Sequence, residues 1–205
     1  MLYKSTVKPE LLELLIAFMS NNNFSQFKLA GGTALALQIG HRISTDLDFF
    51  TTESFDNEKI IELLKHNNYQ IVIFNNSERI LQLLVNNIKV DFLFLSYPEI
   101  NSTEEIEGLK LYSKEDIAAM KLNAITNRGA KKDFYDLYFL LNYFSMTQMI
   151  SFFQTKFVQN DIFALYKSLT YFDSADNEPD PILFKKLSWT KVKKRIIDET
   201  YKIIY

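Results

Sequence analysis

The sequence contains no cysteine and few glycines, prolines or tryptophans. Among its 205 residues there are 5 Gly, 4 Pro and 1 Trp. The lack of cysteine excludes a disulfide framework and thiolate chemistry. No apolar run approaches the roughly 20 residues that a membrane-spanning helix needs, and the first residues lack the pattern of a secretory signal. We therefore expect a cytoplasmic protein without a membrane partner.

Apolar and aromatic residues are abundant. Hydrophobic residues make up 47% of the chain and aromatic residues 15%. This composition excludes a disordered chain and is sufficient for one large domain or two small ones. The formal net charge of −2 predicts no general attraction to nucleic acid, so any such binding must come from a local basic patch.

The two halves of the chain differ in their periodicity, and together they predict the α+β class. The first half mixes helical and strand patterns, which predicts a mixed sheet with packing helices. After Pro98 an acidic, turn-rich link leads to mostly helical patterns. We predict a catalytic domain over residues 1–100 and a helical domain over 101–205 that packs against it and completes its site. In the first half we expect helices from Pro9 and over 57–68, strands at 26–30, 46–50 and 69–74, and two strands joined by a turn at Asn86–Asn87.

A glycine pair precedes a short apolar helix pattern. Gly31, Gly32 and Thr33 follow a predicted strand. Glycine lets the backbone approach a ligand closely, and a helix N-terminus favours negative charge. Thr33 can cap the helix or touch a phosphate. These residues are candidates for nucleotide binding, although the motif taken alone is more typical of an ordinary turn.

Three carboxylates form the most specific pattern. Asp46 and Asp48 lie two apart in a predicted strand and so share one face. Asp91 is the sole acid in the apolar stretch IKVDFLFL. If the two strands are neighbours, the three acids converge, and burying them unpaired would be costly. Oxygen ligands of this kind suit Mg²⁺, with Mn²⁺ as an alternative, in a two-metal phosphoryl-transfer centre. The alternative for Asp46 and Asp48 is a solvated strand face.

Two polar residues lie just before the paired acids. Arg42 can reach a phosphate or serve as the structural partner of a carboxylate, and the residues do not decide between these roles. Ser44 can bond a nucleotide or orient Asp46. His41 is more typical of a turn residue than of a catalytic base.

These residues resemble a known family. The stretch LAGGTALALQIGHRISTDLDFF is similar to the AbiEii/AbiGii toxin family within the DNA polymerase β-like nucleotidyltransferase superfamily, and Asp91 in KVDFL matches the third acid of that family. A second block, AMKLNAITNRGAKKDFYDLYFLL, also resembles the family, so that the resemblance covers roughly residues 26–145. It implies the nucleotidyltransferase fold and an NTP substrate.

The resemblance also implies functional residues in the second block. Lys121 is expected to contact the triphosphate or to assist proton transfer. Asp133 and Asp136 share a helix face, and Lys132 can reach Asp136 four residues on. We expect this cluster to complete the active site, with Asp136 catalytic and with Lys132 and Asp133 near the nucleotide. The alternative is an intrahelical ion pair at the domain interface.

Basic residues recur near the C-terminus. Six cations and no acid lie in KKLSWTKVKKR (185–195). This run can contact an RNA backbone or a triphosphate, but a solvated helix face is the commoner explanation. Trp189 within it is expected to anchor the core.

The function expected from these features is magnesium-dependent transfer of NMP from an NTP to an RNA acceptor. The family resemblance favours tRNA, a toxin role in a type IV toxin–antitoxin or abortive-infection system, and an antitoxin encoded nearby. One alternative is nucleotidylation of a protein hydroxyl. Another is a non-catalytic nucleotide-binding or interaction module.

Overall fold

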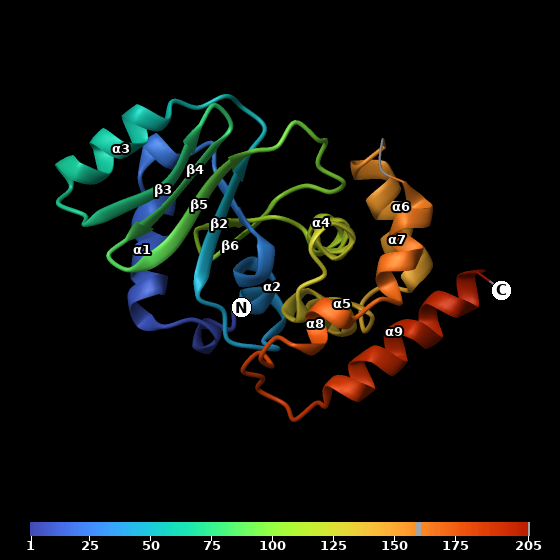
Figure 1. Cartoon of the computed structure of the whole chain (residues 1–205). Coiled ribbons are helices and arrows are strands. Elements are labelled where there is room, and N and C mark those ends of the chain that lie inside the picture. Colours follow the sequence, from blue (N-terminus) through green and yellow to red (C-terminus); the bar gives the residue numbers. More distant parts are fainter. Residues whose placement is uncertain (159–160, 205) are drawn as a thin grey trace. The chain divides into compact units, whose positions relative to one another are not determined.

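The computed structural model describes residues 1–158 and 161–204 (Figure 1). Its residue contacts divide the chain into two compact units. Unit 1 comprises Met1–Gly40, Ser44–Pro98 and Thr103–Tyr112. Unit 2 comprises His41–Ile43, Glu99–Ser102 and Ser113–Tyr205. Unit 1 contains a mixed sheet with packing helices and unit 2 is helical, so the predicted α+β class is confirmed.

Unit 1 is built on a seven-stranded sheet with the strand order β3-β4-β5-β2-β1-β7-β6. Strand β2 runs antiparallel to β1 and parallel to β5, and β5 runs antiparallel to β4. The strands are β1 (Lys28–Ala30), β2 (Asp46–Thr51), β3 (Ile71–Ser77), β4 (Ile80–Val85), β5 (Ile88–Phe94), β6 (Glu104–Ile106) and β7 (Leu109–Leu111).

Strand β2 separates its apolar and acidic side chains by simple alternation. Leu47 and Phe49 are almost fully buried, whereas Asp46 and Asp48 on the opposite face are half-buried. The Phe49 ring stacks on Phe92 of β5 at 5.3 Å. Because successive strand residues point to opposite faces, packing this core fixes the direction of both acids.

Three helices and two short 3₁₀ turns complete unit 1. Pro9 begins α1, where its missing N–H and fixed φ suit the first helical position. Phe18 of α1 contacts the rings of Phe49 and Phe92, so this helix covers the apolar face of the sheet. The segments are η1 (Lys4–Thr6), α1 (Pro9–Met19), η2 (Asn22–Phe24), α2 (Gly31–Ile39) and α3 (Asn57–His66).

The turn between β4 and β5 confirms the predicted hairpin. Asn86 and Asn87 have φ of 48° and 65°. Two consecutive residues with positive φ match the twist of the flanking strands, and asparagine tolerates this conformation well. The register then follows directly, with Val85 opposite Ile88 and Gln82 opposite Asp91.

The link predicted after Pro98 is only partly a link. Residues Glu104–Ile106 and Leu109–Leu111 form the hairpin β6–β7, which extends the sheet beyond β1. The expectation of a turn-rich link was wrong here. Each strand has only three residues, and the charged sequence EEIEGLKL shows too little apolar alternation to indicate a strand. Buried Leu109 and Leu111 secure the pairing.

Unit 2 consists of six helices within the described part of the chain. A buried ion pair joins two of them, because Lys156 Nζ lies 2.7 Å from Asp116 Oδ1 and both side chains are 0% exposed. Asp116 also accepts hydrogen bonds from the backbone of Ile100 and Asn101. The helices are α4 (Lys114–Asn127), α5 (Lys131–Leu140), α6 (Met146–Lys156), α7 (Ile162–Leu169), α8 (Asp173–Asp176) and α9 (Trp189–Ile204).

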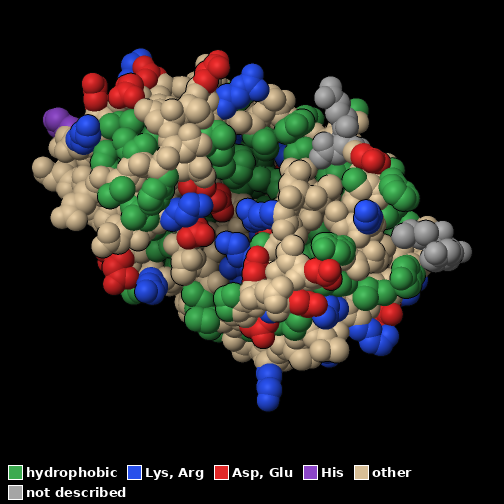
Figure 2. All heavy atoms as spheres, viewed as in Figure 1, with side chains coloured by type: hydrophobic (Ala, Val, Ile, Leu, Met, Phe, Trp, Pro, Cys, Tyr) green, Lys and Arg blue, Asp and Glu red, His purple; other side chains and the backbone are tan. Residues whose placement is uncertain are grey.

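The surface carries mixed charge. In the face shown in Figure 2, acidic and basic side chains are interspersed among apolar and polar ones, as the small net charge suggests. Across residues 1–158 and 161–204, no helix combines the length and apolar character needed to cross a membrane.

Candidate active site

The glycine pair lies at the junction between β1 and α2. Helix α2 begins at Gly31, which has φ of +66°, a conformation that favours glycine. Thr33 is buried, and its hydroxyl donates a hydrogen bond to the Asp46 carbonyl and lies 2.8 Å from the Ser44 hydroxyl. The two buried hydroxyls, both predicted nucleotide contacts, therefore tie the start of α2 to the start of β2.

Gly31 also leaves room for an acid. A Cβ atom on Gly31 would lie 2.2 Å from Asp48 Oδ2, far inside van der Waals contact. Ala30, the preceding residue, is paired with Asp48 between β1 and β2. Residue 31 is therefore glycine for two reasons, its backbone conformation and the close approach of the Asp48 carboxylate.

The three predicted metal-binding acids lie on the two adjacent parallel strands β2 and β5. Asp48 is paired directly with Asp91, and Asp46 is paired with Lys89. The prediction required that these strands be neighbours, and they are. All four residues occupy alternate positions, so that they lie on the same face of the sheet.

Asp91 has an uneven set of partners. Its Oδ2 accepts hydrogen bonds from Gln82 Nε2 at 2.8 Å and from Lys89 Nζ at 3.0 Å. Its Oδ1 is buried and has no hydrogen-bond partner among the described residues. A buried carboxylate oxygen without a partner is costly, and a ligand bound to this atom would remove that cost.

Lys89 and Gln82 were not identified from the sequence. Burial acts to lower the pKa of Lys89, but its hydrogen bond to Asp91 and the charges of Asp91, Asp48 and Asp46 raise the pKa overall. Lys89 therefore stays charged and neutralises part of the acid cluster. Two signals were available: Lys89 lies two residues before Asp91 and shares its face, and the hairpin register places Gln82 opposite Asp91.

The donors on this face fit a divalent cation. They are carboxylate oxygens, which Mg²⁺ and Mn²⁺ prefer, and one of them is buried with no hydrogen-bond partner in residues 1–158 and 161–204. The side chains are not preassembled, because no group of three or more His, Cys, Asp or Glu in residues 1–158 and 161–204 stands close enough to hold a metal ion. The strand positions place the three acids on one face of the sheet, as a metal centre requires, but their side chains do not converge on one point in this structure.

A second charged cluster lies within unit 2 and centres on Asp136 of α5. Arg42 binds its carboxylate with two hydrogen bonds, Nε to Oδ1 at 2.6 Å and Nη2 to Oδ2 at 2.9 Å. His41 Nε2 lies 2.7 Å from Oδ1, and Lys121 Nζ lies 2.6 Å from Oδ2. Arg42 therefore has a carboxylate partner, which is one of the two roles predicted for it.

Asp133 extends this cluster. Lys121 Nζ lies 2.9 Å from Asp133 Oδ1, and Arg128 binds the same carboxylate at 2.8 and 3.1 Å. Asp133 and Asp136 are 0% exposed and Lys121 is 6% exposed. Both acids therefore hold Lys121.

Asp136 and Lys121 stay charged despite burial, whereas His41 does not. Burial opposes ionisation of Asp136, yet Arg42 and Lys121 hold its pKa well below the usual value. Burial would also lower the pKa of Lys121, but Asp136 and Asp133 raise it. Burial lowers the pKa of His41, so this ring is neutral and donates its Nε2 proton to Asp136. These groups form a compensated network of fixed charges.

Lys132 differs from its neighbours on α5. It is exposed, whereas Asp133 and Asp136 are buried. The structure therefore gathers Arg42, Lys121, Asp133 and Asp136 within unit 2 and leaves Lys132 on the helix surface. It gathers Gly31, Thr33, Ser44 and the three metal-binding candidates within unit 1.

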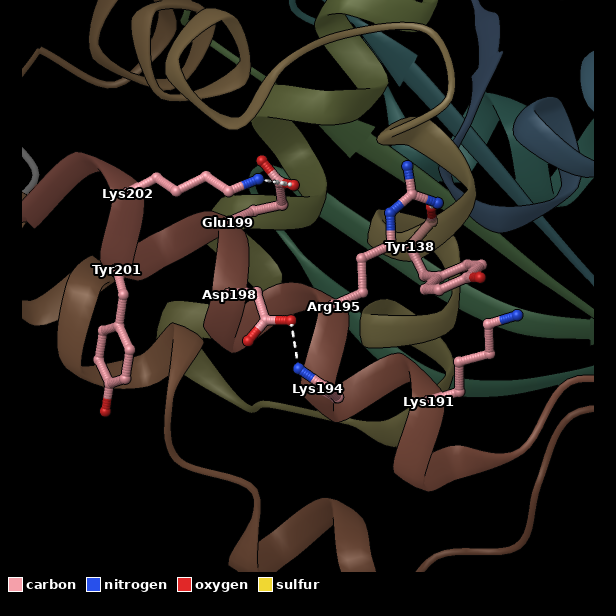
Figure 3. A pocket seen from close by; sticks show the side chains of 8 residues that line it. All are labelled: Tyr138, Lys191, Lys194, Arg195, Asp198, Glu199, Tyr201 and Lys202. Carbon is pink, nitrogen blue, oxygen red and sulfur yellow. Dashed lines mark hydrogen bonds and ion pairs between the residues drawn. The ribbon is translucent and has the colours of Figure 1, made fainter.

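A groove runs along the C-terminal helix (Figure 3). Its volume is about 790 Å³. The lining residues are Tyr138, Lys191, Lys194, Arg195, Asp198, Glu199, Tyr201 and Lys202. Two of the cations pair with acids of the same helix, Lys194 with Asp198 and Lys202 with Glu199, each at 2.7 Å.

Other residues of the basic run also have structural contacts. Arg195 donates hydrogen bonds to the Leu141 carbonyl and to Asn142 Oδ1, and Lys193 binds Asp176 at 2.8 Å. RNA contact by this run stays a prediction. Trp189 packs against the rings of Tyr135, Phe134 and Phe172, as an anchor would.

Comparisons with known proteins identify the family of this chain. The model of the family described as "Nucleotidyl transferase AbiEii toxin, Type IV TA system" matches residues 13–202. A relative at 35% identity over 181 residues is the uncharacterized protein aq_aa25 of Aquifex aeolicus (strain VF5), with 84% of this chain and 86% of that protein covered.

Solved structures share the fold. A protein of H. pylori described as a candidate nucleotidyltransferase aligns with a TM-score of 0.60 at 17% identity, covering 95% of this chain and 92% of that one. JHP933 from Helicobacter pylori aligns with a TM-score of 0.56 at 15% identity, covering 96% and 93%. The antibiotic-resistance factor ANT(2'')-Ia aligns with a TM-score of 0.51 at 13% identity, covering 71% and 91%. The predicted family, fold and enzyme class are confirmed.

Proposed function

Because the chain belongs to the AbiEii nucleotidyltransferase toxin family, we propose that it transfers NMP from an NTP to a hydroxyl of an RNA acceptor, with tRNA as the preferred class. The observation that carries this proposal is the pairing of Asp48 with Asp91 on parallel strands, with Asp91 Oδ1 buried and without a hydrogen-bond partner in the part of the chain that the structure describes.

The acids of unit 1 are assigned the metal-binding role. Asp46, Asp48 and Asp91 hold the divalent cation, Mg²⁺ or Mn²⁺. When bound, it neutralises the charge that develops on the phosphates. Gly31, Gly32 and Thr33 shape the start of α2, where backbone N–H groups and the helix dipole favour a triphosphate. Ser44 supports this turn through Thr33.

The reaction forms one bond and breaks one. The acceptor oxygen bonds to the α-phosphorus, and the bond from that phosphorus to the oxygen that bridges to the β-phosphorus breaks. Pyrophosphate leaves with the electron pair. The Asp91 carboxylate takes the proton of the attacking hydroxyl and returns it to solvent, as a general base.

The residues of unit 2 are given supporting roles. Arg42, Lys121, Asp133 and Asp136 form a buried network, and their catalytic and nucleotide-binding roles stay predictions, as does that of Lys132.

We also propose that the protein acts as the toxin of a type IV toxin–antitoxin pair in the cytoplasm, where its NTP and tRNA substrates are found, with an antitoxin encoded nearby.

The test is label transfer. The protein is incubated with each α-labelled NTP, Mg²⁺ and total tRNA, in parallel with Asp48→Asn and with the exposed-acid control Glu78→Gln. We expect label on RNA with the parent and the control, and none with Asp48→Asn. Absence of transfer from every NTP, or label on protein in place of RNA, would overturn the proposed acceptor.

The toxin role needs its own readout. Expression of the parent is expected to stop growth, and expression of Asp48→Asn at the same level is not. Equal growth inhibition by both proteins would contradict a catalytic origin of the toxicity.

A further inference from the structure

Five directly paired positions form one row across the sheet of unit 1. Asn75 of β3 is paired with Gln82 of β4, Gln82 with Asp91 of β5, Asp91 with Asp48 of β2, and Asp48 with Ala30 of β1. Figure 1 shows β3, β4, β5 and β2 side by side in this order, and β1 follows β2 in the sheet. The row leads from the outer strand β3 to the glycine turn.

Hydrogen bonds follow part of this row. Asn75 Nδ2 donates to Gln82 Oε1 at 3.4 Å, and Gln82 Nε2 donates to Asp91 Oδ2 at 2.8 Å. An amide side chain can face a carboxylate with its NH₂ or with its oxygen. The Asn75 donor holds the oxygen end of Gln82, so that the NH₂ end faces Asp91.

A bulge in β3 brings Asn75 into the row. The pairing register shifts between Ile73, which is opposite Leu83, and Asn75, which is opposite Gln82. Phe74 has no opposite residue in this register, and its side chain is 59% exposed. Without the extra residue, Phe74 would lie opposite Gln82 and no amide donor would reach it. Bulges re-aim side chains in this manner beside functional sites.

The effect on Asp91 is selective. Its Oδ2 has two donors, Gln82 and Lys89, while Oδ1 has none among the described residues. Two fixed donors on one oxygen hold the carboxylate in one orientation and leave the other oxygen to accept a ligand. Partners of this kind orient metal ligands and strengthen binding.

We propose that Asn75 and Gln82 are positioning residues that fix Asp91 through Oδ2 and so reserve Oδ1 for the divalent cation. The inference rests on the proposed function, because it presupposes that Asp91 binds a metal. It extends the site by two strands, to β4 and β3.

The test measures the affinity of the folded protein for Mn²⁺ alone by electron paramagnetic resonance. The variants are Gln82→Leu, Asn75→Ala, the double variant, and the control Asn76→Ala. Asn76 is the next residue of β3 and contacts Asn57 and Glu58 instead. It matches Asn75 in type and strand but lies outside the row.

We expect Gln82→Leu to weaken Mn²⁺ binding about 10-fold, the lower end of the range for such partners. Asn75→Ala is expected to weaken it about 2- to 3-fold, because its 3.4 Å contact is long. Asn76→Ala is expected to have no effect. Because Asn75 acts through Gln82, Asn75→Ala should add nothing in the Gln82→Leu background.

Three outcomes would overturn the proposal. They are an unchanged affinity in Gln82→Leu, equal effects of Asn75→Ala and Asn76→Ala, or additive effects in the double variant. If Gln82→Leu does not fold, the comparison of Asn75→Ala with Asn76→Ala still decides. The parent and Asp91→Asn form a separate pair: equal Mn²⁺ binding by these two would overturn the proposed metal role of Asp91 itself, whatever the other variants do.

Discussion

The two acid clusters of this chain differ in how their charges are balanced. In unit 2, Asp133 and Asp136 are fully buried and meet Arg42, Lys121 and Arg128 in direct ion pairs. In unit 1, Lys89 binds Asp91 and lies in the field of Asp46 and Asp48, and one oxygen of Asp91 has no partner among the described residues.

This difference is the basis for the separate roles that we propose for the two clusters. The acids of unit 2 are held by several cations, and removal of any member exposes the rest to the cost of an unpaired buried charge. Neighbouring carboxylates repel one another, and a divalent cation relieves that repulsion. The unpartnered oxygen of Asp91 is the reason for which we propose the metal site in unit 1, although both clusters contain conspicuous acids.

The largest expected effect is a loss of stability when the charged cluster around Asp136 in unit 2 is disrupted. Asp136→Asn leaves Arg42 and Lys121 buried with a single acid between them, and we expect the free energy of unfolding to fall by about 3 to 5 kcal/mol. Urea denaturation monitored by circular dichroism measures this. A variant as stable as the parent but inactive would show that Asp136 acts in the reaction.

The next largest effect is a loss of activity when the acid cluster of unit 1 is changed. Asp48→Asn removes a metal ligand and a like charge, so we expect label transfer to fall at least about 10³-fold, equivalent to about 4 kcal/mol. The free energy of unfolding should stay within about 1 kcal/mol of the parent or rise, because repulsion is relieved. A large loss of stability would mean that this cluster is balanced too.

A smaller effect sharpens the role of the glycine turn. Gly31→Ala combines an unfavourable φ with a clash against Asp48. Gly108, which is changed in the control Gly108→Ala, also has a positive φ, +78°, but a Cβ atom there would meet no described atom within 4 Å apart from its chain neighbours. Each change should lower the free energy of unfolding by about 1 to 2 kcal/mol through the backbone. Only Gly31→Ala should also reduce label transfer, by more than about 10-fold, because it displaces Asp48. Equal transfer by the two variants would contradict the close contact.

The smallest effect concerns His41. Burial lowers its pKa below the usual 6.5, so the unfolded chain binds the proton first as the pH falls. The free energy of unfolding should therefore decrease below pH 6.5, by up to about 1.4 kcal/mol at pH 5.5. His41→Asn keeps a hydrogen-bond donor but does not titrate, and urea denaturation at pH 7.5 and 5.5 should show a weaker dependence. The same dependence in both proteins would exclude His41 as its source.

Much of unit 1 could be predicted from the sequence because its signals are local. Alternation fixed the faces of Asp48 and Asp91, and Asn86–Asn87 marked the hairpin. The hairpin β6–β7 was missed because three-residue strands carry almost no periodicity. Lys89 could have been found from its spacing to Asp91.

The charge network of unit 2 was less predictable. Arg42 and Asp136 lie far apart in the sequence, and no periodicity links them. The spacing within α5 predicted contact between Lys132 and Asp136, but Lys132 is exposed while Asp136 is bound by Arg42, His41 and Lys121. Long-range packing decided which cation each acid received.

The proposed metal site in unit 1 is tested most directly by an Mn²⁺ titration followed by electron paramagnetic resonance. The titration uses the parent, Asp48→Asn and Asp136→Asn at equal concentrations of folded protein. We predict saturable binding by the parent and by folded Asp136→Asn, and a loss of at least about 10-fold in affinity for Asp48→Asn. Unchanged binding by Asp48→Asn, or its loss in folded Asp136→Asn, would contradict the assignment of the metal to unit 1.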